Sequence, residues 1–237
     1  MFFCRPDGMD VVILAAGRGT RFGRGLPKCL VRFRGKTLLE RQVAALRDAC
    51  PELEPWRVHV VTGYKHDLVE QHVRKTRLGV SLLFNPSWNS AGILGSAWVS
   101  LPHVGPEVLR LDSDLLFSDH SELARLLAAP ATSLCLGHSY RPRTTPIACV
   151  RNGRVESISL VDNYKGPGEW LCAEFYKEGD YAKVVQSSPD LIIEGHYFKA
   201  MNRSILSGPP YPLAFWMSGA YEMDSEEDLS HVRRMLS

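Results

Sequence analysis

The stretch Val11-Val-Ile-Leu-Ala-Ala-Gly-Arg-Gly-Thr-Arg21 decides the fold, because a short apolar run leads directly into small residues and glycines. Such a run predicts a buried strand, and the glycines let the chain turn sharply and present backbone N–H groups to an anion. No acidic residue occurs between Asp10 and Glu40, whereas basic residues are frequent there: Arg18, Arg21, Arg24, Lys28, Arg32, Arg34 and Lys36. The pattern predicts a polyphosphate-binding loop, and we expect the last three of these bases to lie beyond it.

The rest of the chain has the alternation of an α/β protein. Strand-like and helix-like segments follow one another at 11–15, 36–49, 58–62, 66–75, 80–84, 90–101 and 108–111. This order predicts βαβ units and a Rossmann-like, mainly parallel sheet flanked by helices. The second half instead offers short strand candidates at 133–139, 146–150 and 154–160, a hairpin signal at Asn152-Gly153 and a further apolar run at 170–176. We expect these to form a small antiparallel flap or subdomain.

Composition excludes several classes of protein. The chain has 237 residues, 45% of them hydrophobic, which is enough for a full core. Its 28 basic and 26 acidic residues nearly balance, which argues against a general nucleic-acid binder. We find no signal peptide and no apolar stretch near the roughly 18 residues of a membrane span. The six cysteines lack zinc-site spacing, so we expect reduced thiols, a cytoplasmic location and no membrane partner.

The glycine loop fits neither of two common phosphate-binding patterns. Phe22 stands where a dinucleotide fingerprint needs its third glycine, and the Gly-Lys-Ser/Thr ending of a P-loop is absent. What remains is Gly17-x-Gly19-Thr-Arg21 followed by Pro27-Lys28. A glycine turn with solvated bases is the plain structural alternative.

This two-part pattern, Leu14-Ala-Ala-Gly-x-Gly-Thr-Arg21 with Pro27-Lys28, resembles the signature of the nucleotidylyltransferases. It is nearest to the small choline-phosphate and phosphonate cytidylyltransferases and the related sugar-1-phosphate enzymes. The resemblance implies Mg²⁺-dependent transfer of NMP from an NTP, CTP favoured, to a small phosphate or phosphonate acceptor, with release of pyrophosphate. It makes Arg21 and Lys28 catalytic and assigns the nucleotide to Leu14, Ala15, Ala16, Gly17, Arg18, Gly19 and Thr20. It also divides a single domain, 1–237, into a nucleotide-binding half (about 9–130), an acceptor-binding half (about 131–222) and a C-terminal helix (223–237).

Two acidic segments are the candidate metal ligands. Asp112-Ser-Asp114 follows the strand at 108–111, and a carboxylate at a parallel strand's end suits a hard divalent ion. The resemblance places Asp114 at the metal position, with Asp112 beside the nucleotide. It makes Asp224, in Tyr221-Glu-Met-Asp224-Ser225, the second ligand. Turn and helix-cap roles are the alternatives, and an N-cap carboxylate can still offer an oxygen to a metal.

The remaining contacts are assigned by resemblance. Asn85-Pro-Ser-Trp-Asn-Ser90 with Gly92 is similar to the base-recognition loop, so Asn85, Ser90 and Gly92 are expected beside the nucleotide. Lys165 matches an acceptor-phosphate lysine by spacing, with a solvated loop lysine as the alternative. Trp170 could belong to an aromatic cage for a quaternary ammonium and Glu174 could meet an amine, although core packing competes for the aromatic residues. Because the chain ends soon after the second acidic motif, we expect a small acceptor.

Two other functions stay open. One is a hexose-1-phosphate nucleotidylyltransferase that uses dTTP, UTP or GTP. The other is a non-catalytic nucleotide-sensing module, against which the combination of Lys28, Asp114 and Asp224 argues, since a sensor has no need of both metal ligands. The sequence leaves open whether the protein forms a homo-oligomer.

Overall fold

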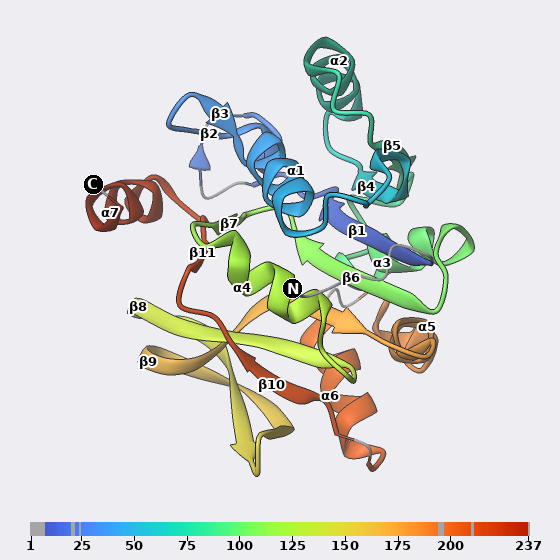
Figure 1. Ribbon diagram of the computed structural model, residues 1–237, viewed down its shortest axis with the longest axis vertical. Coiled ribbons are helices and arrows are strands. Elements are labelled where there is room, and N and C mark those ends of the chain that lie inside the picture. The colour runs from blue at the N-terminus through green and yellow to red at the C-terminus, as the bar shows by residue number, and fades with distance from the viewer. Residues whose placement is uncertain (1–7, 20–21, 24, 194–196, 210, 237) are drawn as a thin grey trace.

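The fold is built on one sheet that runs through the molecule (Figure 1). The computed structural model describes residues 8–19, 22–23, 25–193, 197–209 and 211–236. Within these residues the sheet has seven strands in the order β10-β8-β9-β6-β1-β4-β5. Their bounds are β1 Met9–Ala15, β4 Val58–Thr62, β5 Ser81–Phe84, β6 Glu107–Asp112, β8 Ser133–Arg151, β9 Arg154–Tyr176 and β10 Leu213–Trp216.

Strand β1 lies inside the parallel part of this sheet. It pairs in parallel with β4 and β6, and β4 pairs in parallel with β5. Strand β9 then joins β6 and β8 in antiparallel register, and β10 runs parallel to β8. The mixed α/β architecture with a mainly parallel central sheet, predicted from the alternation of segments, is confirmed. In this register Leu14 of β1 lies beside Asp112 of β6, so the carboxyl ends of the two strands meet at one edge.

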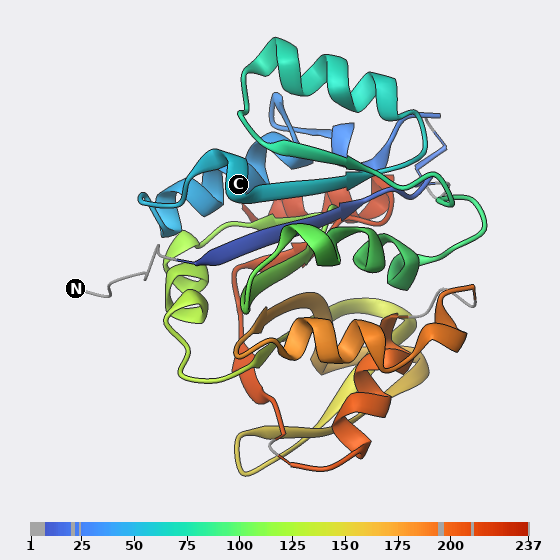
Figure 2. The same ribbon diagram turned by 90° about the vertical axis from the view of Figure 1, so that its right-hand side faces the viewer.

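Helices cover both faces of the sheet (Figures 1 and 2). One apolar cluster joins α1, α2 and α4 to the sheet, and a second joins α3, α5 and α6 to its other face. The helices are α1 Leu38–Ala49, α2 His66–Thr76, α3 Ile93–Ser100, α4 His120–Leu127, α5 Asp180–Gln186, α6 Tyr197–Leu206 and α7 Glu226–Met235. Short 3-10 turns are η2 Lys28–Leu30, η3 Pro55–Arg57, η4 Leu101–His103 and η5 Pro189–Leu191.

The apolar run of β1 is continuous because both of its faces are buried. Val11 and Ile13 belong to the cluster beneath α1, α2 and α4, whereas Val12 and Leu14 belong to the cluster beneath α3. Successive side chains of a strand point to opposite faces, so a strand covered on both sides needs apolar residues at every position. The sequence pattern that predicted this strand therefore has a direct structural cause.

Helix α1 begins at a capping box. The Thr37 hydroxyl accepts a hydrogen bond from the Glu40 N–H at 3.1 Å, and the Glu40 carboxylate accepts one from the Thr37 N–H at 2.7 Å. These bonds satisfy two N–H groups that have no partner inside the helix. The helix predicted at 36–49 is confirmed, with its start moved to Leu38.

The second half is more continuous than the sequence suggested. Instead of several short strands it contains β8 and β9, which form one long hairpin with register shifts along its length. The predicted turn at Asn152-Gly153 is confirmed, and both residues have positive φ, 49° and 74°, as a two-residue hairpin requires. The predicted antiparallel flap is present as this hairpin, and β9 also continues into the main sheet beside β6. The register shifts let one strand bend where the sequence suggested separate pieces.

Two small antiparallel pairs complete the described structure. Strand β2 (Arg32–Phe33) pairs with β3 (Lys36–Thr37), and β7 (Leu115–Phe117) pairs with β11 (Ala220–Glu222).

Among the described residues, no helix combines the length and hydropathy that crossing a membrane requires. Four cysteines in this part are free thiols, namely Cys29, Cys135, Cys149 and Cys172. Cys50 is disulfide-bonded, so the prediction of reduced thiols is wrong at that position.

Candidate active site

A cavity of about 550 Å³ opens at the carboxyl ends of β1 and β6. Its wall combines the glycine loop after β1, the start of α3, the turn after β6 and the middle of β8. The described lining residues are Leu14, Ala16, Gly17, Gly19, Lys28, Trp88, Ala91, Gly92, Ile93, Ser96, Asp112, Ser113, Asp114, Arg143, Thr144, Thr145, Pro146, Cys172, Glu222 and Asp224. This is the edge at which open α/β sheets usually bind their ligands.

The glycine loop lies against Lys28. Gly19 has a φ of +60°, and a Cβ built on it would lie 2.9 Å from the Cβ of Lys28. A side chain at this position would therefore strain the backbone and press on Lys28. Pro27 holds an extended conformation before the 3-10 turn that carries Lys28, which directs the lysine back toward the loop.

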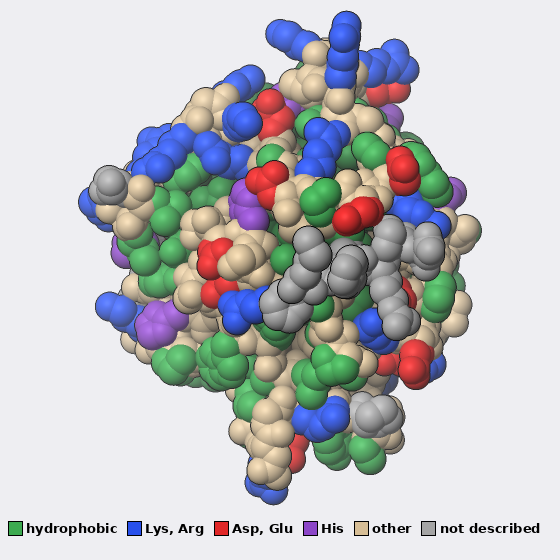
Figure 3. Space-filling view, in the orientation of Figure 1, with side chains coloured by type: hydrophobic (Ala, Val, Ile, Leu, Met, Phe, Trp, Pro, Cys, Tyr) green, Lys and Arg blue, Asp and Glu red, His purple; other side chains and the backbone are tan. Residues whose placement is uncertain are grey.

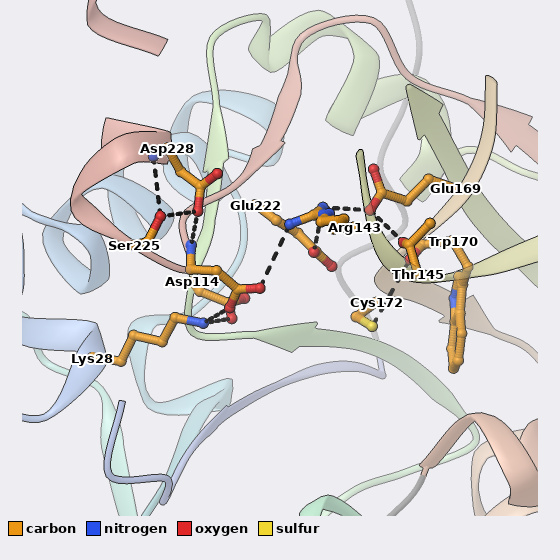
Figure 4. A network of polar contacts seen from close by, with 11 residues as sticks. Lys28, Asp114, Arg143, Thr145, Glu169, Trp170, Cys172, Glu222, Ser225 and Asp228 are labelled. Atoms are coloured by element: carbon orange, nitrogen blue, oxygen red, sulfur yellow. Dashed lines mark hydrogen bonds and ion pairs between the residues drawn. The ribbon is translucent and has the colours of Figure 1, made fainter. Parts of the chain in front are cut away.

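Lys28 contacts two carboxylates from distant parts of the chain. Its ammonium forms ion pairs with Asp114, in the turn between β6 and β7, and with Asp224, between β11 and α7 (Figure 4). Pairing of β7 with β11 brings these acids together, and the Met223 N–H donates to the Asp114 carbonyl at 3.0 Å. Burial alone would lower the pKa of Lys28, but the two carboxylates outweigh it and raise that pKa.

A second polar cluster surrounds Arg143 of β8; it consists of Arg143, Thr145, Glu169, Glu222 and Asp224. The guanidinium pairs with Glu169, with Glu222 at 2.9 Å and with Asp224 at 3.5 Å. Thr145 donates a further hydrogen bond to Glu169 at 2.6 Å. Asp224 therefore connects the Arg143 cluster to Lys28, and the two cations face a shared group of acids.

A buried guanidinium supports Asp112 from beneath. Arg110 of β6 is fully buried and pairs with Asp112, which lines the cavity, and with Glu174 of β9 at 3.1 Å. Burial raises the pKa of Asp112 to about 6, although the Arg110 guanidinium opposes this. The Asp112 carbonyl also accepts a hydrogen bond from Gln42 of α1 at 2.7 Å. Asp112 is thereby held at its place in the cavity wall.

Comparison with known proteins identifies this arrangement. The family model described as MobA-like NTP transferase domain matches residues 11–177, well over half of the chain. The chain belongs to this family. Among curated relatives, the bifunctional protein GlmU of Stutzerimonas stutzeri (strain A1501) is 32% identical over 158 residues. That match covers 65% of this NTP transferase chain but only 33% of the relative.

Solved structures share the fold of this NTP transferase domain. The CTP:phosphocholine cytidylyltransferase from Streptococcus pneumoniae superposes with a TM-score of 0.79 at 18% identity, over 97% of this chain and 100% of that one. The inositol-1-phosphate CTP transferase from T. maritima reaches 0.77 at 19% identity, over 96% and 94% of the two chains. At these identities the likeness establishes the common fold.

The site of this NTP transferase domain has the features that a divalent cation needs. The Asp114 Oδ1 atom is buried and has no hydrogen-bond partner. Among the described residues, two cations, Lys28 and Arg143, face four acids: Asp114, Asp224, Glu169 and Glu222. Burial raises the pKa of Glu222 well above its usual range, and the neighbouring acids add to this against Arg143. Within the described part of the site the acids outnumber the cations, and a divalent cation would reduce the repulsion between them.

The chain offers only part of a coordination shell. No group of three or more His, Cys, Asp or Glu side chains arranged for a metal occurs in the described part of the chain. Asp114 and Asp224 are the residues that would hold Mg²⁺. Magnesium usually keeps one or two carboxylates and takes its other ligands from phosphate oxygens and water. The two carboxylates fit this mode of binding.

The loop residues predicted for the nucleotide take different places in the structure. Leu14, Ala16, Gly17 and Gly19 line the cavity, whereas Ala15 is buried beneath them. Arg18 is exposed, and its guanidinium lies over the Trp88 ring at 5.1 Å. Thr20 and Arg21 lie outside the described residues, so their assigned roles stay predictions.

The segment predicted to recognise the base contacts the cavity through Gly92 and through Trp88, which the sequence did not single out. Asn85 is buried; it donates to Ser96 at 3.1 Å and accepts from the Ser87 N–H at 2.9 Å, so it shapes the turn. Ser90 is exposed and outside the cavity wall, while Gly92 lies in that wall. The Trp88 side chain reaches the wall because Gly63 leaves room, since a Cβ there would lie 2.3 Å from the Trp88 Cβ.

The three acceptor contacts predicted from the sequence do not line the cavity in the described structure. Trp170 is buried in the apolar core, where its ring packs 6.3 Å from that of Tyr197. Glu174 is fully buried against Arg110, and Lys165 is exposed on β9. Among the described lining residues the single aromatic side chain is Trp88, so the aromatic cage is not formed there. Core packing, the alternative stated for the aromatic residues, accounts for Trp170.

Sequence reasoning missed Arg143 and the contacts that Glu169 and Glu222 make with it. Glu222 belongs to the motif Tyr221-Glu-Met-Asp224-Ser225 that identified Asp224, so the sequence did contain a signal for Glu222. The pairing of Arg143 with Glu169 had no such signal in the sequence, because their proximity depends on the register of β8 against β9.

The basic residues expected to lie beyond the glycine loop do so. Arg32 donates to the carbonyl of Gly35, and Arg34 donates to the carbonyl of Leu236. Figure 3 shows basic side chains gathered over the region of β2, β3 and α7.

Proposed function

We propose that this domain transfers a nucleoside monophosphate, preferably CMP, from an NTP to a small phosphate or phosphonate acceptor. The observation that carries the proposal is Lys28 between Asp114 and Asp224, at the wall of a cavity that the glycine loop also lines. An acceptor oxygen bonds to the α-phosphorus as the α–β bridge breaks, and pyrophosphate leaves with the bonding electrons. The attacking oxygen is already anionic near neutral pH, so no general base is required.

Alignment and charge neutralisation are the tasks of the chain in this reaction. The backbone N–H groups of the glycine loop face the triphosphate. Lys28 offers a compact point charge where the acceptor and the α-phosphate meet, a place for which the broader guanidinium of arginine is less suited. Mg²⁺ held by Asp114 and Asp224 would supply Lewis-acid polarisation and neutralise phosphate charge.

The preference for CTP rests on the structural neighbours. The two neighbours described above are a CTP:phosphocholine cytidylyltransferase and an inositol-1-phosphate CTP transferase, and both superpose over nearly the whole chain. The wall of the cavity near the start of α3, with Trp88, Gly92 and Ser96, is the region we assign to the base.

The test is a panel of substrates with pyrophosphate release as the readout. CTP, UTP, GTP and dTTP are each combined with phosphocholine, 2-aminoethylphosphonate, 2-hydroxyethylphosphonate and glucose 1-phosphate in the presence of Mg²⁺. We expect turnover with CTP and one of the three acceptors that are not sugars. Turnover confined to glucose 1-phosphate with another nucleotide would replace the proposal with a sugar-nucleotide enzyme. Mg²⁺-dependent nucleotide binding without any turnover would favour a sensing module.

A further inference from the structure

Arg143 is the second cation of the cavity. Among the described lining residues, Lys28 and Arg143 are the only basic side chains, and that of Arg143 is 19% exposed. The two approach Asp224 from different sides: Lys28 contacts Oδ1, and Arg143 Nη1 lies 3.5 Å from Oδ2. A single anionic group placed beside Asp224 would therefore lie within reach of both cations.

The guanidinium of Arg143 is held by one of its two terminal nitrogens. Nη2 donates to Glu169 and to Glu222, and Glu169 is fixed in turn by Thr145. Nη1 makes the 3.5 Å contact with Asp224, which exceeds the usual hydrogen-bond length of about 3.2 Å. Figure 4 shows Arg143 between Glu169 on one side and the carboxylates beside Lys28 on the other. The guanidinium is thus anchored through Nη2, while Nη1 faces the reacting centre.

Such an arrangement is costly unless it serves a ligand. Burying an ionised guanidinium costs free energy of desolvation, and the 3.5 Å contact of Nη1 with Asp224 offsets that cost only weakly. A guanidinium whose Nη1 faces the cavity can donate a charge-assisted hydrogen bond to a phosphate oxygen.

We propose that Arg143 binds the phosphate or phosphonate group of the acceptor, opposite Lys28, and that Glu169 and Glu222 are positioning residues that orient it. The inference rests on the proposed function and names the residue that recognises its acceptor. It assigns to Arg143 the role that sequence spacing had suggested for Lys165. The acceptor is then a phosphate monoester or phosphonate whose remaining part extends toward Thr144, Pro146 and Cys172.

The test compares R143M and R143K with the wild type and with R151M. Arg151 lies on the same strand, is 74% exposed in its side chain and pairs with Glu156 outside the cavity, so it is a matched control. Acceptor KM is measured by pyrophosphate release at saturating CTP and Mg²⁺. CTP affinity is measured separately by calorimetry without acceptor, and acceptor affinity is measured on the complex with α,β-methylene CTP, which cannot transfer CMP.

For R143M we expect acceptor KM and acceptor Kd to rise about 10- to 100-fold. CTP affinity should stay within about threefold of the wild type, because the lost contact is made to the acceptor alone. R143K should restore part of the acceptor affinity. R151M should show none of these changes in acceptor KM or Kd. If R143M does not fold, the double variant R143M/E169Q removes one of the carboxylates that lose their partner and is measured in its place.

The outcomes separate this inference from the proposed function. Unchanged acceptor affinity in R143M, with normal transfer by the wild type, overturns the role of Arg143 alone. A fall of CTP affinity by the same factor overturns it too, because Arg143 would then serve the nucleotide. A third outcome is that the wild type binds a phosphonate, that R143M binds it more weakly, and that neither releases pyrophosphate. In that case the proposed function fails and the role of Arg143 stands. A wild type that binds none of the four acceptors overturns both.

Discussion

Lys28 and Asp114 form an ion pair in the cavity wall, so replacing Lys28 removes a positive charge from the site and replacing Asp114 removes a negative one. We expect K28A and D114N each to reduce the rate of pyrophosphate release by more than about 100-fold, the cost of losing a main electrostatic stabiliser. Asparagine is nearly isosteric with aspartate, so the effect of D114N on turnover reports the loss of the negative charge. The control is K36A, at an exposed position of β3 outside the cavity wall. Near-normal turnover in either variant would show that these residues lack the assigned roles.

Arg110 is a residue whose loss should affect folding. It is fully buried between Asp112 and Glu174, so R110M leaves both carboxyl groups without their cation. We expect the free energy of unfolding to fall by about 3–5 kcal/mol, measured by urea denaturation. R151M, at an exposed arginine, should change it little, and R110M/E174M should recover part of the loss. A fall no larger than that of R151M would contradict the importance of this buried ion pair.

At the scale of secondary-structure elements, the start of α7 positions Asp224. The Asp228 carboxylate accepts hydrogen bonds from the Asp224 N–H and the Ser225 hydroxyl, both at 2.9 Å, and Ser225 accepts one from the Asp228 N–H at 3.3 Å. The helix cap and the candidate metal ligand therefore share one hydrogen-bond network. This confirms the predicted cap region at Asp224-Ser225, with Ser225 as the N-cap residue.

D228A removes the acceptor of both bonds. We expect the free energy of unfolding to fall by about 1 kcal/mol, the usual value of a helix cap. We also expect the Mg²⁺ concentration for half-maximal pyrophosphate release to rise, because Asp224 is less firmly oriented. S230A, at an exposed position of the same helix, is the control. An unchanged Mg²⁺ requirement, together with lowered stability, would confine Asp228 to a structural role.

The β7–β11 pair is the other element that builds the site. It joins residues 115–117 to residues 220–222, and both candidate metal ligands lie just beyond its ends. Pairing in this register places Leu115 opposite Glu222, so Asp114 and Asp224 arrive on one side of the cavity. A two-residue slip would separate them by about 7 Å, because a strand advances about 3.3 Å per residue.

At the scale of the whole molecule, pH should alter stability through Glu174. Burial raises the pKa of Glu174 to about 7 from its ordinary value of 4.5, although the Arg110 guanidinium opposes this. Between these pH values the native protein binds more protons at this position than the unfolded chain does. Because the native state binds the extra proton, Glu174 contributes fully to the free energy of unfolding below pH 4.5. This contribution is lost as pH rises through 7.

The variant E174Q has an amide that does not titrate, so it lacks this contribution. We expect the free energy of unfolding of the wild type, relative to E174Q, to decline by more than about 1 kcal/mol across this range. Urea denaturation at a series of pH values measures the difference, with E52Q, at an exposed position, as the control. A difference that is constant, or that grows with pH, would contradict a raised pKa at Glu174.

Sequence was most informative about features whose cause is local. The run Val11–Ala15 and the hairpin turn at Asn152-Gly153 were predicted because the apolar pattern and the preference for positive φ are encoded in a few adjacent residues. The candidate site was also predicted in outline, since Lys28, Asp114 and Asp224 each lie in a recognisable local pattern and the fold brings them together.

Sequence alone was therefore sufficient for the α/β fold, for the glycine loop that lines the cavity and for the three residues at the centre of the candidate site. Only the tertiary structure showed that Arg143 lines the cavity while Trp170 and Glu174 are buried. These residues lie on the long strands β8 and β9, whose register shifts change which side chains face each other. A one-residue shift turns a side chain from the core to the cavity, and that shift depends on contacts between segments far apart in the chain.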